Sequence, residues 1–170
     1  MTDVDPEQLS AEIRTFISKR TSLQLATHDK HKQLNVSYAP FAVMGEQFYI
    51  LISQLARHCS NLQEVPESSI MLIEDETQCH NPFARKRLIY QVSAHSIERG
   101  SASWDEGMAA LIERFGPFAK QLSSLADFEL FRLKVKDGQY VKGFGRAFSL
   151  TGNDLSEVDD LMGQDKKSAR

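Results

Sequence analysis

Hydrophobic residues first recur at helical spacing and then, over most of the chain, at the spacing of β-strands. Leu9, Ile13 and Phe16 lie three or four positions apart and follow Asp5 and Pro6, a capping residue and a favoured first-turn residue. This pattern predicts an amphipathic helix at the start of the chain, with one apolar face packed against the elements that follow.

Short apolar runs separated by polar turns predict about seven strands. The runs cover residues 22–27, 34–43, 48–53, 69–73, 88–97, 128–136 and 139–150. Helical periodicity interrupts them at residues 54–65, at 103–115 and in a shorter stretch that ends near residue 125. Because Asp137 and Gly138 form a strong hairpin signal, we expect the last two runs to pair with a turn between them.

Many short strands of even spacing favour a closed barrel over an open sheet, since closure removes the exposed strand edges. We therefore predict a mainly β fold of the α+β class, a six- to seven-stranded antiparallel β-barrel with surrounding helices. The barrel domain is expected to occupy residues 1–150. Residues 151–170 are rich in charged side chains and are expected to form a polar C-terminal tail.

Composition and charge narrow the function classes. The 170 residues include 20 Lys and Arg against 23 Asp and Glu, a net charge of −3, so we expect no nucleic-acid partner. No apolar run approaches the roughly 20 residues of a membrane-spanning helix, and the first residues are polar and acidic, unlike a secretory signal. Cys59 and Cys79 form no CxxC pair, so neither a disulfide framework nor a metal site is expected. These features predict a cytoplasmic protein.

Two clusters of basic residues suit an anionic ligand. Arg57 and His58, with Asn61 beside them, lie where a strand meets a helix, and backbone amides at the start of a helix attract anions. Arg85 and Arg87 lie where a loop enters a strand, and their guanidinium groups offer paired donors to phosphate or carboxylate. Solvated loop charge explains the second cluster nearly as well.

A third cluster is the segment VKGFGRAF, which places Gly143 and Gly145 in a predicted strand between Lys142 and Arg146. Glycine in a strand costs roughly 1 kcal/mol relative to alanine, so two such positions need a reason. A sharp bend at a barrel corner is one explanation, and the close approach of a flat ligand is the other. The pattern favours neither.

Six segments follow one another in a characteristic order: LQLAT (23–27), NVSYAPF (35–41), ILISQLARHCSNL (50–62), SIMLIEDE (69–76), FARKRL (83–88) and VKGFGRAF (141–148). Together they resemble the haem-iron-utilisation proteins of the HugZ/HutZ type. Those proteins belong to the flavin-binding split-barrel superfamily that includes pyridoxamine 5'-phosphate oxidase. The resemblance extends over roughly residues 10–155.

This resemblance implies a homodimer of split barrels, with ligand sites at the interface built from both protomers. The implied ligand is haem in the haem-utilisation branch and FMN in flavin-binding members. Arg57 and His58 match phosphate contacts, Arg87 matches a basic residue of the pocket, and Asp127 matches an acidic residue that supports the iron-ligating histidine of haem-degrading members. The candidate ligand-binding residues are Arg57, His58, Asn61, Arg85, Arg87, Lys142, Gly143 and Phe144, and the candidate catalytic residue is Asp127.

The sequence departs from these proteins at that C-terminal histidine. Gly163 precedes the expected position, but Gln164 and Asp165 follow it, and no histidine occurs after His95. An amide is a poor replacement for imidazole as an iron ligand. Three functions are therefore compatible with the sequence: a haem-binding protein that degrades haem to release iron, an FMN-dependent oxidoreductase, and a haem carrier without catalysis. The sequence does not identify an electron donor.

Overall fold

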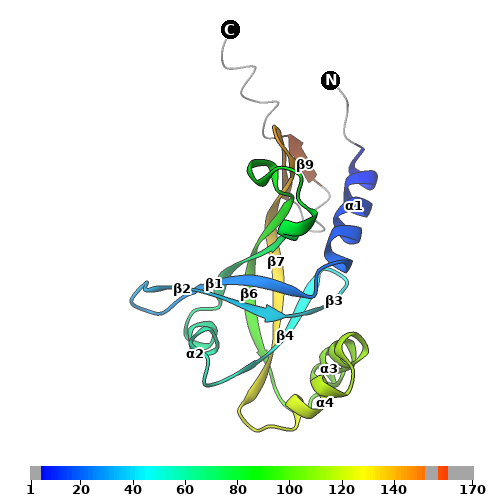
Figure 1. Cartoon of the computed structure of the whole chain (residues 1–170). Helices are drawn as coiled ribbons and strands as arrows, with labels where there is room; N and C mark the ends of the chain where they lie inside the picture. The colour runs from blue at the N-terminus through cyan, green and yellow to red at the C-terminus, as the bar shows by residue number, and fades with distance from the viewer. Residues whose placement is uncertain (1–4, 152–156, 161–170) are drawn as a thin grey trace. The chain divides into compact units, whose positions relative to one another are not determined.

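The computed structural model describes residues 5–151 and 157–160 (Figure 1). Its helices are α1 (Pro6–Ser18), α2 (Arg57–Glu64), α3 (Ala102–Phe115) and α4 (Pro117–Ser123), with two short 3-10 helices, η1 (Glu76–Gln78) and η2 (Pro82–Ala84). Its strands are β1 (Ser22–His28), β2 (Leu34–Pro40), β3 (Ala42–Met44), β4 (Gln47–Ser53), β5 (Glu67–Ile73), β6 (Arg87–Ile97), β7 (Phe128–Gly143), β8 (Arg146–Thr151) and β9 (Glu157–Asp160).

The chain divides into two compact units. One contains Thr21–Ile70 and Gln91–Val135 and is called here the α3 unit. The other contains Met1–Arg20, Met71–Tyr90 and Lys136–Arg170 and is called the α1 unit. Strands β5, β6 and β7 each contribute residues to both units.

Hydrogen bonds connect the strands in the order β2-β1-β5-β6-β7-β4-β3, with β8 beside β7 and β9 beside β8. The pairs β1–β2, β3–β4, β4–β7, β7–β8 and β8–β9 are antiparallel. The prediction of an α+β fold built on antiparallel strands is confirmed, and the strands form one large sheet. The described residues contain more strands than expected, because the run 34–43 divides after Pro40 and because residues 157–160 add β9.

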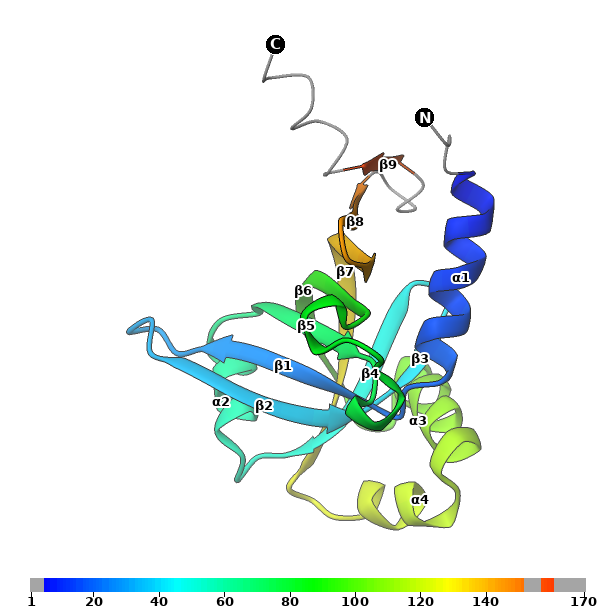
Figure 2. The ribbon, with the colours of Figure 1, turned by 45° about the horizontal axis from the view of Figure 1, so that its top comes forward.

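In the α3 unit, helix α3 packs against the sheet. The Ser101 hydroxyl caps α3 by accepting a hydrogen bond from the backbone N–H of Trp104 at 3.2 Å. Trp104 and Met108 on one face of α3 belong to a buried cluster with Tyr49 of β4 and Leu130 of β7. Figure 2 shows α4 directly after α3, joined through Gly116. None of the described helices is both long and apolar enough to cross a membrane.

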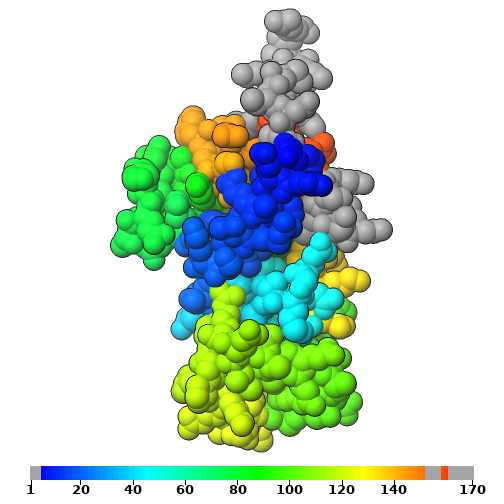
Figure 3. Space-filling view, turned by 90° about the vertical axis from the view of Figure 1, so that its right-hand side faces the viewer, coloured from blue at the N-terminus to red at the C-terminus, as the bar shows by residue number. Residues whose placement is uncertain are grey.

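In the α1 unit, the predicted amphipathic helix is confirmed as α1. The Asp5 carboxylate caps it by accepting a backbone N–H, and Leu9, Ile13 and Phe16 are buried. The Phe16 ring meets the ring of Tyr140 edge-on, with centroids 5.8 Å apart. The opposite face of the helix, blue in Figure 3, lies on the molecular surface.

The hairpin expected at Asp137 and Gly138 is wrong. β7 runs through both residues without turning, and Gly138 is paired with Leu150 of β8. The chain reverses later, between Gly143 and Arg146, where Gly145 has a φ of +69° that favours glycine. Gly143 therefore ends β7 and Gly145 lies in the turn, so the two glycines do not lie inside one strand as expected, and the close approach of a flat ligand stays a prediction.

Candidate functional site

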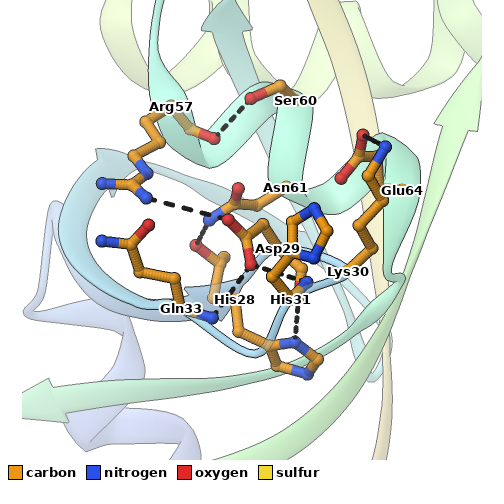
Figure 4. A network of polar contacts seen from close by, with 10 residues as sticks. His28, Asp29, Lys30, His31, Gln33, Arg57, Ser60, Asn61 and Glu64 are labelled. Atoms are coloured by element: carbon orange, nitrogen blue, oxygen red, sulfur yellow. Dashed lines mark hydrogen bonds and ion pairs between the residues drawn. The ribbon is translucent and has the colours of Figure 1, made fainter.

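The first candidate residues lie around the β1–β2 turn and the start of α2, in the α3 unit (Figure 4). Arg57 is the first residue of α2, and its Nη2 lies 3.9 Å from Oδ2 of Asp29. Oδ1 of Asp29 accepts the backbone N–H groups of Gln33 and His31, both at 2.9 Å. The Gln33 bond, followed by that of His31, lowers the pKa of Asp29 below its usual value. An anion approaching Arg57 therefore competes with an ionised carboxylate.

His58 and Asn61 follow on the same helix and have different surroundings. His58 is half-buried, and loss of solvent lowers the pKa of its imidazole, which favours the neutral ring at pH 7. Asn61 is only 2% exposed, and its Nδ2 donates to Oγ1 of Thr27 in β1 at 3.0 Å. Asn61 therefore joins α2 to β1 inside the unit, while His58 keeps a face toward the surface.

Asp127 lies next to the turn that leads from β4 into α2. The Ser53 hydroxyl donates to Oδ2 of Asp127 at 2.9 Å, and the backbone N–H of Gln54 donates to the Asp127 carbonyl at 2.7 Å. Ser53 Oγ also accepts the backbone N–H of Leu55 at 3.2 Å. The register that pairs Ser53 with Phe128 positions these groups. The structure thus brings the candidate catalytic residue to the β4–α2 turn.

Glu129, the second residue of β7, accepts several hydrogen bonds and was not among the candidates predicted from the sequence. Its carboxylate accepts from Nε2 of Gln54 at 2.5 Å and from Nε2 of Gln63 at 2.8 Å. The thiol of Cys59 lies 4.0 Å from the same carboxylate. No local pattern marks Glu129, because the partners of its carboxylate lie 66 to 75 positions away in the sequence.

Burial, and then the negative charge of Glu129, raises the pKa of the Cys59 thiol to about 11 from an ordinary value of 9.0. The thiol is therefore protonated at neutral pH and is a weak nucleophile. Because the unfolded chain ionises first, the stability that this thiol contributes is complete below pH 9.0 and is lost as the pH rises toward 11.

We expect the free energy of unfolding to fall with a slope of up to about 1.4 kcal/mol per pH unit from this thiol. The measurement is urea denaturation at several alkaline pH values. Cys59→Ala removes this part of the slope, whereas Cys79→Ala, the matched control, keeps it. Equal slopes in the two variants would contradict the assignment to Cys59.

Arg85 and Arg87 belong to the α1 unit, around η2 and the start of β6. Nε of Arg85 donates to the Glu74 carbonyl at 2.5 Å, and its Nη1 forms an ion pair with Glu76 at 3.0 Å. Nη1 of Arg87 donates to the Arg85 carbonyl at 3.1 Å. Arg85 therefore fixes the η1–η2 loop, and its backbone in turn orients Arg87.

Lys142, Gly143 and Phe144 lie at the β7–β8 turn of the α1 unit. The Lys142 ammonium forms an ion pair with Oε2 of Glu12, whose Oε1 accepts the Tyr140 hydroxyl at 3.0 Å. Burial, and then Glu12, raises the pKa of Tyr140, so the phenol remains a donor. Phe144 is 82% exposed, and a side chain added at Gly143 would meet no atom within 4 Å. The turn therefore offers a bare aromatic face beside a basic group.

The candidate residues fall into two groups. Arg57, His58, Asn61 and Asp127 lie in the α3 unit, and Arg85, Arg87, Lys142, Gly143 and Phe144 lie in the α1 unit. A single anion site shared by Arg57, His58 and Arg87 stays a prediction. Gln164 and Asp165 lie outside the described residues. Within residues 5–151 and 157–160, no three His, Cys, Asp or Glu side chains cluster closely enough to hold a metal ion.

A family model described as pyridoxamine 5'-phosphate oxidase matches residues 9–142. The chain belongs to this family. Heme oxygenase HutZ from Vibrio cholerae serotype O1 is 48% identical over 154 residues, which cover 91% of this chain and 88% of HutZ. The resemblance seen in the sequence motifs is thereby confirmed.

Solved structures of the family have the same fold. The crystal structure of HutZ, described as the heme storage protein from Vibrio cholerae, has a TM-score of 0.74 and 44% identity, covering 86% of this chain and 98% of HutZ. Campylobacter jejuni ChuZ has a TM-score of 0.83 and 30% identity, covering 94% of this chain and 64% of ChuZ. This pyridoxamine 5'-phosphate oxidase-type fold carries Arg57 at a helix start and Asp127 and Phe144 in turns, where ligands commonly bind.

Proposed function

We propose that this protein binds haem in the cytoplasm and serves in the use of haem iron. The observation that carries the proposal is the 48% identity with heme oxygenase HutZ, over nearly the whole length of both chains. The crystal structure of HutZ itself, 44% identical to this chain, is described as that of a heme storage protein. Oxidative degradation of haem and storage without catalysis are thus two activities of one proposed site.

The side chains fit the two chemical faces of haem, a flat apolar ring and two carboxylate groups. Phe144, exposed between glycines, offers a surface on which a ring can stack. Arg85, Arg87 and Lys142 supply cationic groups in the same unit, and guanidinium groups bind carboxylates through paired hydrogen bonds. We assign the propionates to Arg87 and Lys142, with Lys142 exchanging its contact with Glu12 for the ligand.

In the degradation reaction, bound haem supplies the iron at which oxygen is activated. Arg87, Lys142 and Phe144 of the α1 unit would orient the ring and balance its carboxylate charge. Asp127 of the α3 unit would hold a proton: Ser53 donates to its Oδ2 and fixes the plane of the carboxyl group, which would accept a proton from the ligand or a water.

We further propose that the protein is a homodimer of split barrels that completes each site with residues of both copies. Leu34, Val36 and Tyr38 alternate along β2 and are 80%, 78% and 68% exposed. A strand at the end of the sheet order, with three large apolar side chains on one face, supports a two-fold interface with a second copy.

An FMN-dependent oxidoreductase is the second candidate, because the family model is that of pyridoxamine 5'-phosphate oxidase. Arg57, at the start of α2, and His58 would contact the FMN phosphate. The Arg57–Asp29 ion pair weighs against this assignment, since a dianionic phosphate beside Asp29 would be repelled.

Titration of the purified chain with haemin, followed by absorbance, tests the proposal. We expect saturable binding of one haemin per chain, with a spectrum unlike that of histidine ligation, since Gln164 stands at the expected ligand position. Gln164→His is expected to tighten binding and to shift the spectrum toward histidine ligation. Flavin absorbance in the purified protein and no saturable haemin binding would contradict the proposal. Loss of haem absorbance with release of ferrous iron after a reductant is added distinguishes degradation from storage.

A further inference from the structure

We propose that Arg99 is a positioning residue for Asp127. The inference rests on the proposed function, in which Asp127 acts beside the ligand. Arg99 itself is exposed in the turn between β6 and α3, 28 positions before Asp127 in the sequence. It acts on the backbone that carries Asp127.

The guanidinium of Arg99 donates to three backbone carbonyls of the segment that joins α4 to β7. Its Nη1 donates to the Ser123 carbonyl, and its Nη2 donates to the carbonyls of Leu125 and Phe128, at 2.9 and 2.8 Å. These carbonyls lie on both sides of Asp127 in the chain. One planar, charged group therefore fixes the backbone before and after the carboxylate.

The segment between these anchors is a tight turn. The backbone N–H of Phe128 donates to the Leu125 carbonyl at 3.3 Å, so Asp127 is the third residue of a four-residue turn. From the other side, Gln54 donates to the Asp127 carbonyl and Ser53 donates to its carboxylate. Asp127 is thus held from two sides, by the hydrogen bonds of Arg99 to the surrounding backbone and by the hydrogen bonds of Ser53 and Gln54. Loss of the Arg99 hydrogen bonds removes one of these two supports.

Trp104 holds the Arg99 guanidinium in place. The guanidinium carbon of Arg99 lies 4.4 Å from the centroid of the Trp104 ring, a cation–π contact. Trp104 is 7% exposed and packs in the buried cluster of α3, so its ring cannot follow a moving side chain. A lysine at position 99 would keep the positive charge. It would lose the stacking of a planar group on Trp104 and the several N–H donors that reach three carbonyls.

The first test needs no ligand. We expect Arg99→Lys to speed hydrogen exchange of the Gln54 amide about tenfold, which corresponds to about 1.4 kcal/mol, because the carbonyl that it binds becomes mobile. Arg114→Lys is the matched control: Arg114 stacks on Phe41 at 4.6 Å in the same unit, and the Gln54 amide should exchange as in the parent. Unchanged Gln54 exchange in a folded Arg99→Lys protein would overturn the proposal.

The second test uses haemin and a double-mutant cycle of Arg99→Lys and Asp127→Asn. If Arg99 acts through Asp127, Arg99→Lys changes the haem absorbance spectrum in the parent and adds nothing in the Asp127→Asn background. Equal spectral changes in both backgrounds would mean that Arg99 has only a general structural role, and the proposal would be wrong. A parent chain that binds no haemin contradicts the proposed function alone, since Gln54 exchange still decides whether Arg99 positions Asp127.

Discussion

Replacing Gly138 by alanine is expected to lower the free energy of unfolding by about 3 kcal/mol, at the upper end of what overpacking usually costs. A Cβ at this position would lie 2.6 Å from Cε1 of Tyr90 and 2.9 Å from the carbonyl oxygen of Ile89. The Tyr90 ring is 4% exposed and has no open space to enter, and a backbone oxygen moves only with its strand. The strand itself must therefore shift.

Gly143→Ala is the matched control for this change. Both glycines lie in β7, but a Cβ at Gly143 would meet nothing within 4 Å, so the expected change is below about 1 kcal/mol and can be stabilising. Urea denaturation of the three proteins, at equal concentration, gives the comparison. A Gly138→Ala midpoint as close to the parent as that of Gly143→Ala would contradict the close packing against Tyr90.

The same glycine explains why local sequence signals misplaced a hairpin. An Asp-Gly pair between two alternating runs favours a two-residue turn when the runs pair with each other. In the structure, the first run pairs with β4, from Gln47–Lys134 to Ser53–Phe128, and the second run folds back on itself, since its residues 139–143 pair with β8. β4 is distant from the Asp-Gly pair in the sequence, whereas β8 follows β7 after the turn at residues 144–145. Tertiary pairing overrode the turn signal, and the glycine serves a close contact with Tyr90 instead.

Elements with a strong internal period were predictable. The apolar stripe of α1 and its Asp5 cap are local features, and both occur where the sequence places them. The residues that position Asp127, in contrast, could not be predicted from any local pattern. Its hydrogen bond to Ser53 joins residues 74 positions apart, and Arg99 resembles an ordinary solvated loop charge until the chain is folded. Family resemblance indicated Asp127, while its partners depend on strand register and loop packing, which no local pattern contains.

Asn61 was predicted from the sequence to bind the ligand, but in the structure its amide donates a hydrogen bond to Thr27. Asn61 and Thr27 are each 2% exposed. Thr27→Val is expected to lower the free energy of unfolding by about 2 kcal/mol, since it leaves a buried N–H donor without its acceptor. Asn61→Leu removes the donor and is expected to cost less, because the hydroxyl that remains is smaller and can turn toward a backbone carbonyl.

The double variant Thr27→Val/Asn61→Leu decides between a structural bond and a ligand contact. When both partners become apolar, nothing polar is left buried, so we expect the double variant to be within about 1 kcal/mol of the parent and more stable than Thr27→Val alone. Urea denaturation measures this coupling, and haemin titration of the same protein measures the ligand contribution. Additive losses of stability would contradict a direct bond between the two side chains. If the double variant recovers its stability but binds haemin about tenfold or more weakly, Asn61 is a ligand residue as well as a link between α2 and β1. In that case loss of the amide weakens ligand binding and leaves the fold intact.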